Sequence, residues 1–261
     1  GNREFHRKDP FPAAIVANTV PTRYSDDVIL FRAEGVRIDD GAPVVEGLTF
    51  SSAGRNVAFV GAPRALFEAT AGVRAVTAGK LLVADLDPRE ALRQGRLASA
   101  PADTPLPPRW TILELAIENA RLAGHGRRDR ARLAAGAVHA MQLDEQAHTR
   151  LGAAEPAVKH AALLAAALAT DAPTLVVEDF TPGLPDAAAR TLARAFVTAA
   201  KGRQWVLFAG RLALSSPLGL EAEEAVLFSG GRFACAGLPA EIATRERTYS
   251  VRTSGEKALA F

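Results

Sequence analysis

An uninterrupted apolar run, TLVVED at 174–179, ends in two carboxylates and sets the strongest limit on the fold. A strand with apolar residues at nearly every position is buried on both faces, which is typical of a parallel sheet covered by helices. A helical segment follows, with Pro185 at its start and Gly202 as its stop, and QWVLFAG at 204–210 is the next buried strand. This strand–helix–strand order predicts an α/β domain with a mainly parallel core sheet.

The first part of the chain is rich in strands. Three β-rich segments, separated by the turn-like DDG and AGR, predict a small antiparallel β layer. They are VILFRAEGVRI (28–38), PVVEGLTFSS (43–52) and NVAFVGA (56–62). A short helix is expected at 65–72, ending on Gly72, and further strands at 80–85 and 95–100.

The middle of the chain turns helical after the proline-rich stretch at 100–110. Three helices are expected, at 111–124, 127–143 and 155–170. Thr111 is suited to cap the first helix, and Pro156 takes the first helical position of the third. This block predicts a helical subdomain at about 111–170, inserted into the α/β domain.

A last hairpin and the two ends complete the predicted organisation. EAVLFSGGRFACAG is expected to turn at Gly230–Gly231 and to be followed by a short helix in PAEIATRE. The chain divides into an N-terminal arm or linker at 1–26, a domain at 27–245 and a C-terminal tail at 246–261.

Composition excludes several classes of protein. The net charge of +2 comes from 31 basic and 29 acidic residues, so nothing indicates nucleic acid as a partner. No apolar run approaches the ~18 residues of a membrane span, and the start lacks the apolar core of a signal peptide. Cys235 is the only cysteine and cannot form an internal disulfide. A cytoplasmic protein is expected.

Four segments, which follow the family's order along the chain, resemble the ATPase subunits of ABC transporters. APADTPLPPRWTILELAIENA is similar to the family's Q-loop and the helix that follows it. LLAAALATDAPTLVVEDFTPGL is similar to the helix and the strand that ends in its acidic pair, AAKGRQWVLFAGRLAL to its later strand, and FSGGRFACAGLPAEI to its closing segment. The resemblance covers about residues 28–245 and implies the P-loop NTPase fold.

The phosphate-binding loop of that family needs G-x-x-x-x-G-K-[ST], in which backbone amides and a lysine hold phosphates and a hydroxyl holds Mg²⁺. Here Gly61 remains after the strand, but it is only eleven positions from Gly72, and no lysine stands between Lys8 and Lys80. Arg64 could meet a phosphate as a charge, although a surface arginine is the better interpretation. The resemblance therefore implies that the loop is deleted and that ATP and Mg²⁺ are no longer bound.

The other catalytic motifs of the family are also altered. Ala102 falls where the family has its Q-loop glutamine, and Gly210 falls at the H-loop histidine. The Walker B acids stand in reversed order as Glu178 and Asp179, a vestigial pair rather than a working one, and Pro185 takes the D-loop aspartate position. No catalytic residue is expected.

Two recognition features of the family are missing as well, and the histidines offer no metal site in their place. Asp39 and Asp40 lie where an aromatic residue would stack on adenine, and Ala154–Val158, or a shifted segment from Leu151, replaces the signature. No histidine has convincing metal spacing. The histidines are His6, His125, His139, His148 and His160.

These losses predict a catalytically inactive ATPase homologue that works as a binding, scaffold or regulatory subunit. The expected partner is an active ABC ATPase subunit or a membrane permease, with a second copy of the chain as a further candidate. Contact with the inner membrane is expected only through such a partner. The alternative is a slow ATPase that uses Asp179 or Glu178 as its base and Arg64 or the Gly61 region as its phosphate grip.

Trp110 is the candidate contact residue. It stands beside Arg109 in a proline-rich segment, a composition typical of an interface anchor. A core tryptophan that closes the helical block onto the sheet is the other interpretation, and the sequence slightly favours it.

Overall fold

The computed structural model describes residues 29–39, 43–52, 54–210, 217–229 and 232–245. The strands are β1 Phe31–Asp39, β2 Pro43–Ser51, β3 Asn56–Val60, β4 Ala78–Val83, β5 Leu97–Ala100, β6 Thr174–Glu178, β7 Gln204–Ala209, β8 Glu224–Ser229 and β9 Arg232–Gly237. The helices are α1 Arg64–Thr70, α2 Pro88–Arg93, α3 Ile112–Leu122, α4 Arg127–Ala140, α5 Pro156–Ala169 and α6 Asp186–Ala199. Residues 239–245 are also helical.

The strands form two sheets. One is antiparallel with the order β2-β1-β4, and the other has the order β5-β6-β7-β3-β8-β9, parallel except for β9. The predicted α/β architecture, with an antiparallel layer beside a mainly parallel core sheet, is confirmed.

The placement of β3 in the antiparallel layer was wrong. This strand pairs in parallel with β7 and β8, and β4 supplies the third strand of the antiparallel sheet. The physical reason is burial on both faces: every position from Val57 to Val60 is buried, as expected for a central strand rather than for one with a solvated face.

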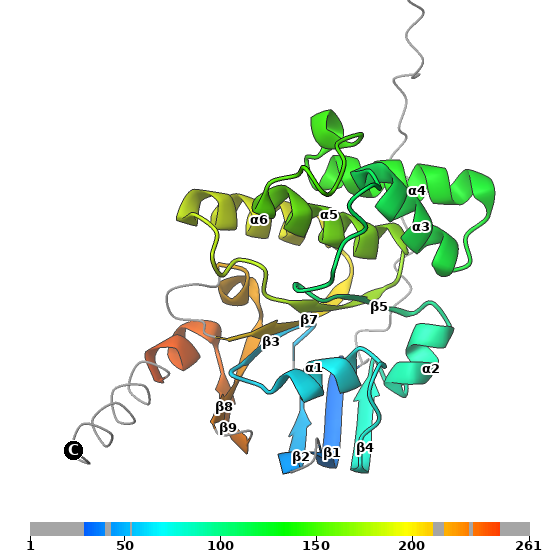
Figure 1. The fold of residues 1–261 in the computed structure, drawn as a ribbon. Helices are drawn as coiled ribbons and strands as arrows, with labels where there is room; N and C mark the ends of the chain where they lie inside the picture. Colours follow the sequence, from blue (N-terminus) through cyan, green and yellow to red (C-terminus); the bar gives the residue numbers. More distant parts are fainter. Residues whose placement is uncertain (1–28, 40–42, 53, 211–216, 230–231, 246–261) are drawn as a thin grey trace, which may run out of the picture.

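Alternate residues of the core sheet face two different hydrophobic layers. Ala58 and Val60 of β3 point to the layer made with helices α3 to α6, whereas Val57 and Phe59 point to the layer made with the antiparallel sheet and α1. Figure 1 shows this arrangement, with α3, α4, α5 and α6 on one side of the core sheet and β1, β2 and β4 on the other. The core sheet is therefore the middle layer and positions both flanking layers.

An aromatic cluster joins the two sheets. The Phe59 ring lies edge-on to the rings of Phe31, at 4.6 Å between centroids, and of Phe208, at 5.1 Å. It also meets Phe228 at 5.8 Å and Phe50 at 6.2 Å. Phe59 is fully buried at the centre of this cluster.

The three predicted middle helices are confirmed as α3, α4 and α5. Thr111 caps α3 in a capping box: its hydroxyl accepts from the Glu114 N–H, and the Glu114 carboxylate accepts from the Thr111 N–H. Pro156 occupies the first turn of α5. The helix α2 was missed, although Asp87 caps it by accepting from two backbone amides.

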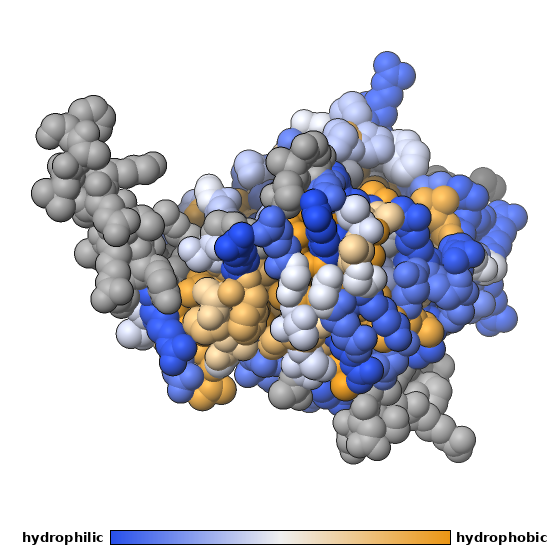
Figure 2. Space-filling view, turned by 90° about the horizontal axis from the view of Figure 1, so that it is seen from below, coloured by the Kyte–Doolittle hydropathy of each residue, from blue (hydrophilic) through white to orange (hydrophobic). Residues whose placement is uncertain are grey.

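The described surface is mixed in character. Figure 2 shows one face on which apolar side chains lie in separate patches among hydrophilic ones. Seven large apolar residues are exposed in the described chain: Val73, Leu92, Trp110, Leu122, Leu220, Phe233 and Leu238. Within the described ranges, no helix is long and apolar enough to span a membrane.

Several predictions lie outside the described residues. These are the arm at 1–26, the tail at 246–261, the turn at Gly230–Gly231 and Asp40. The domain limits at 27–245 and the subdomain limits at about 111–170 stay predictions.

Candidate functional site

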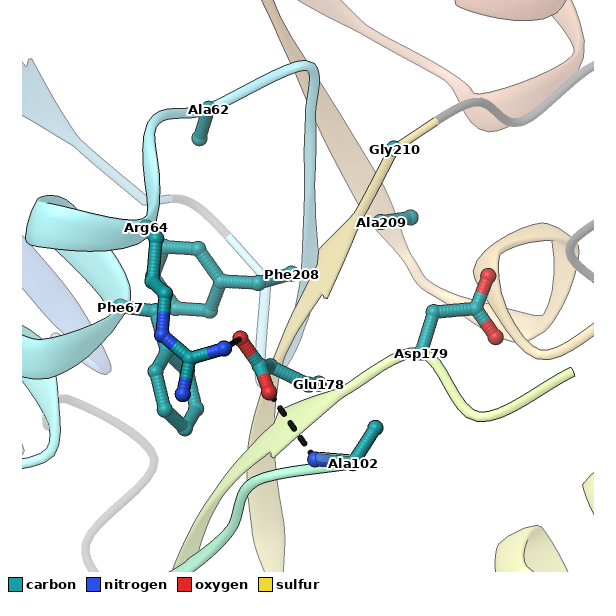
Figure 3. Close-up of a pocket in the computed structure, with 9 residues that line it drawn as sticks. All are labelled: Ala62, Arg64, Phe67, Ala102, Glu178, Asp179, Phe208, Ala209 and Gly210. Atoms are coloured by element: carbon teal, nitrogen blue, oxygen red, sulfur yellow. Dashed lines mark hydrogen bonds and ion pairs between the residues drawn. The ribbon is translucent and has the colours of Figure 1, made fainter. Parts of the chain in front are cut away.

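A cavity of about 300 Å³ opens at the carboxyl ends of β3, β6 and β7 (Figure 3). Its lining residues are Ala62, Arg64, Phe67, Ala102, Glu178, Asp179, Phe208, Ala209 and Gly210. The carboxyl ends of parallel strands are where open α/β sheets bind ligands. The fold thus brings together Arg64, Ala102, Glu178, Asp179 and Gly210, which come from four distant stretches of the sequence.

Gly61 directly precedes the cavity-lining Ala62 and turns the chain sharply after β3. Its N–H donates to the Ala209 carbonyl at 2.8 Å, and its φ is +67°. A Cβ atom added here would lie 3.0 Å from the Phe228 carbonyl oxygen, so the position requires glycine.

The connection from β3 to α1 is only three residues long, 61–63. Helix α1 then runs for seven residues behind Pro63, which provides no side-chain cap. The hydroxyl of Thr70 is buried and donates to the Leu66 carbonyl at 2.7 Å. Three residues therefore separate the end of β3 from the start of α1.

Glu178 ends β6 and faces the cavity. Its carboxylate accepts a 2.9 Å hydrogen bond from the Ala102 N–H and lies 3.4 Å from the Arg64 guanidinium. Burial raises the pKa of this carboxyl, while the Ala102 N–H and the Arg64 charge act in the opposite direction. The Glu178 carboxylate is therefore already in contact with two groups of the protein, the Ala102 N–H and the Arg64 guanidinium.

Asp179 is buried and turns the other way. In Figure 3 its carboxylate points away from that of Glu178. One carboxylate oxygen accepts from the Thr181 N–H at 3.0 Å and from the Thr181 hydroxyl at 2.6 Å. These bonds form a local turn after β6, and the two carboxylates point in different directions.

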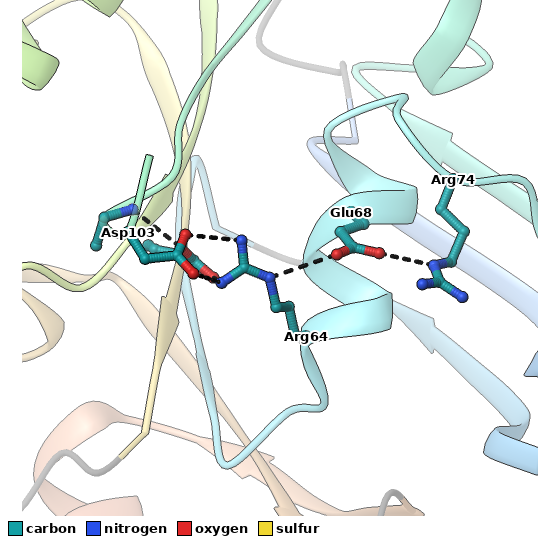
Figure 4. A network of polar contacts seen from close by, with 6 residues as sticks. Arg64, Glu68, Arg74 and Asp103 are labelled. Atoms are coloured by element: carbon teal, nitrogen blue, oxygen red, sulfur yellow. Dashed lines mark hydrogen bonds and ion pairs between the residues drawn. The ribbon is translucent and has the colours of Figure 1, made fainter. Parts of the chain in front are cut away.

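Arg64 is the centre of a network of ion pairs (Figure 4). Its guanidinium donates to both carboxylate oxygens of Asp103, at 2.5 and 2.8 Å, and contacts Glu68 at 3.4 Å. Glu68 is shared with Arg74, at 2.7 Å. The hydrogen bonds from Arg64 hold the pKa of the Asp103 carboxyl below its usual value.

The sequence suggested Arg64 as a surface residue, and its side chain is indeed 48% exposed. Sequence reasoning missed Asp103 and the network. Of these contacts, only the Arg64–Glu68 pair could have been predicted from the sequence, because residues four apart share a helix face.

The remaining predicted residues lie elsewhere. Pro185 is exposed and precedes α6, and Asp39 pairs with Arg37 at 2.9 Å. The segment 154–158 straddles the start of α5.

Trp110 is 37% exposed, so its interpretation as a core residue was wrong. The described residues contain no group of three or more metal-binding side chains.

Solved structures with a similar fold are ATP-binding subunits of ABC transporters. For cbiO1 from Clostridium perfringens, part of the ABC transporter complex cbiONQ, the TM-score is 0.70 at 13% identity, covering 89% of this chain and 99% of that one. For MJ1267, an ATP-binding cassette in its ADP conformation, the TM-score is 0.70 at 14% identity, covering 86% and 98%. A nucleotide-free ATP-binding cassette gives 0.69 at 15% identity, covering 83% and 95%.

No family model and no curated protein matches the sequence. At these identities the likeness is one of fold. The chain therefore has the fold of the ATP-binding cassette.

Proposed function

We propose that this chain is a catalytically inactive homologue of ABC ATPases that acts as a binding, scaffold or regulatory subunit. The observation that carries the proposal is the charge of the cavity. Among the described lining residues, Arg64 is the one cationic side chain, and it is already paired with Asp103 and close to Glu178.

The charge balance of the described residues around the cavity argues against a bound nucleotide. Glu178 and Asp179 line it, and Asp103 and Glu68 stand next to Arg64. Two like charges about 4 Å apart repel by roughly 1 kcal/mol in water and about 4 kcal/mol near a protein surface. The described lining residues include no lysine and no hydroxyl side chain that could offset this repulsion of a triphosphate.

The proposed partners follow from the similar structures. The cbiO1 subunit belongs to a transporter complex. By analogy, the partner proposed for this chain is an active ABC ATPase subunit or a membrane permease, or a second copy of the chain. The protein would then be cytoplasmic and reach the inner membrane through that partner. Chemical cross-linking in cells, followed by affinity capture and mass spectrometry, would identify the partner.

The first prediction is that ATP does not bind. Calorimetric titration with Mg-ATP is expected to give no binding isotherm up to about millimolar nucleotide. A dissociation constant of about 1 mM corresponds to a binding free energy of only about 4 kcal/mol. A related ABC ATPase with an intact phosphate-binding loop serves as the positive control. A micromolar dissociation constant would refute the proposal and favour the slow ATPase.

The second prediction concerns the two acids. Glu178→Gln and Asp179→Asn keep an oxygen that can accept from the Ala102 N–H and from Thr181, but remove the charge that a metal ion or a catalytic base needs. We expect both variants to keep partner binding in the affinity capture, with some change in melting temperature. Loss of partner binding at normal stability would contradict the structural role assigned to these acids.

A further inference from the structure

We propose that Arg64 is a latch that fixes the segment 101–111, here called the connector, between the core sheet and the helical block without any ligand. The inference rests on the proposed function, in which no nucleotide occupies the cavity. The chain's own charged side chains would then hold the cavity in one conformation.

The near end of the connector is held by the core. The Ala102 N–H donates to Glu178 at the end of β6. The next residue, Asp103, is gripped by both ends of the Arg64 guanidinium, which projects from α1. Two parallel bonds from arginine to a carboxylate fix direction as well as distance. Residues from two separate elements, β6 and α1, therefore hold two adjacent positions of the connector, 102 and 103.

The far end of the connector is held by the helical block. The Trp110 carbonyl accepts from the Leu151 N–H at 2.8 Å, and the Pro108 carbonyl accepts from the Gly152 N–H at 3.0 Å. A Cβ atom at Gly152 would come within 2.9 Å of the Pro108 oxygen, so glycine allows this close approach. The exposed Trp110 side chain is thus carried on a segment that is fixed at both ends.

The near end is the weaker attachment, because it depends on side chains that are partly exposed. Asp103 is 64% exposed and Arg64 48% exposed, so each can be replaced without opening the core. Exposed ion pairs contribute modestly, which makes a local opening of the connector the expected effect rather than unfolding.

The test is hydrogen exchange of the connector in the full chain. Arg64→Met and Asp103→Asn are expected to raise the exchange rate of the Ala102 amide, which donates to Glu178, by about threefold or more. The matched control is Arg121→Met. Arg121 also makes a two-bond ion pair, with Glu118, at a similar exposure of 51%, but both residues lie on α3 and connect no separate segments.

Tryptophan fluorescence gives an independent readout. Trp205 is only 2% exposed, so quenching by acrylamide reports mainly on Trp110. Stronger quenching in Arg64→Met and Asp103→Asn, but not in Arg121→Met, would support the latch. Exchange and quenching that are the same in all three variants as in the wild type would overturn it.

A titration with Mg-ATP separates this inference from the proposed function. If the nucleotide slows exchange of the wild-type connector, the proposed inactivity is contradicted, whereas the comparison of Arg64→Met with Arg121→Met still decides whether the latch exists. With both proposals correct, Mg-ATP leaves connector exchange unchanged and only the latch variants raise it.

Discussion

Replacing Phe59 with alanine is expected to lower the free energy of unfolding by about 3–5 kcal/mol. Its fully buried ring meets four other phenylalanine rings from both sheets, so truncation removes transfer free energy and leaves a cavity where the layers join. Because β3 pairs on both sides with other core strands, the sheet cannot easily close around that cavity. Urea unfolding, followed by circular dichroism, measures the effect.

Phe233 is the matched control for this prediction. It lies on β9, stacks on Phe50 at 5.9 Å between centroids and is 40% exposed. Phe233→Ala should therefore cost much less, about 1 kcal/mol or below. Equal destabilisation by the two variants would show that the aromatic cluster does not join the sheets as described.

Local patterns were enough to predict most strands and the three middle helices. The apolar run of β6 and the capping residue Thr111 specify their elements through neighbouring residues alone. The helix α2 was missed because six residues carry too little periodicity, although Asp87 and Pro88 together are a helix-start signal. The partner strands of β3 could not be predicted, because strand patterns specify burial and not which strand lies alongside.

The candidate site could be located but not described from the sequence. Its members were found by comparing motifs, and the fold does gather them around one cavity. What the sequence could not supply is that Arg64 meets Asp103, 39 positions away, and that Glu178 accepts from Ala102, 76 positions away. Such contacts depend on how the layers stack, and no local spacing encodes them.

Those contacts also change how the two acids are understood. The sequence presents Glu178 and Asp179 as remnants of a catalytic pair, while the structure gives each carboxylate its own hydrogen bonds to nearby backbone. Both acids can persist for folding reasons alone, since an acceptor lost from a partly buried site leaves its donors unsatisfied. Their presence is therefore weak support for the slow ATPase.

Replacing Trp110 with alanine is expected to weaken binding of the partner by at least about 2 kcal/mol, or roughly 30-fold, with little change in melting temperature. The side chain is 37% exposed, and its segment is held by backbone hydrogen bonds that the substitution leaves in place. An exposed indole on a fixed segment loses little freedom on binding, which is why such residues are enriched among interface anchors.

Two controls make this prediction decisive. Phe233→Ala removes an aromatic ring of similar exposure, 40%, from a distant strand and should leave partner affinity unchanged. Trp205→Ala removes the buried tryptophan and should cost about 3–5 kcal/mol of stability.

The affinity of each variant is measured by titrating the partner identified by cross-linking, and it is corrected for the fraction of folded protein. If Trp110→Ala lowers the melting temperature strongly while folded molecules bind normally, the anchor is rejected and the exposed arginines at the start of α4, Arg127 and Arg128, become the next residues to replace.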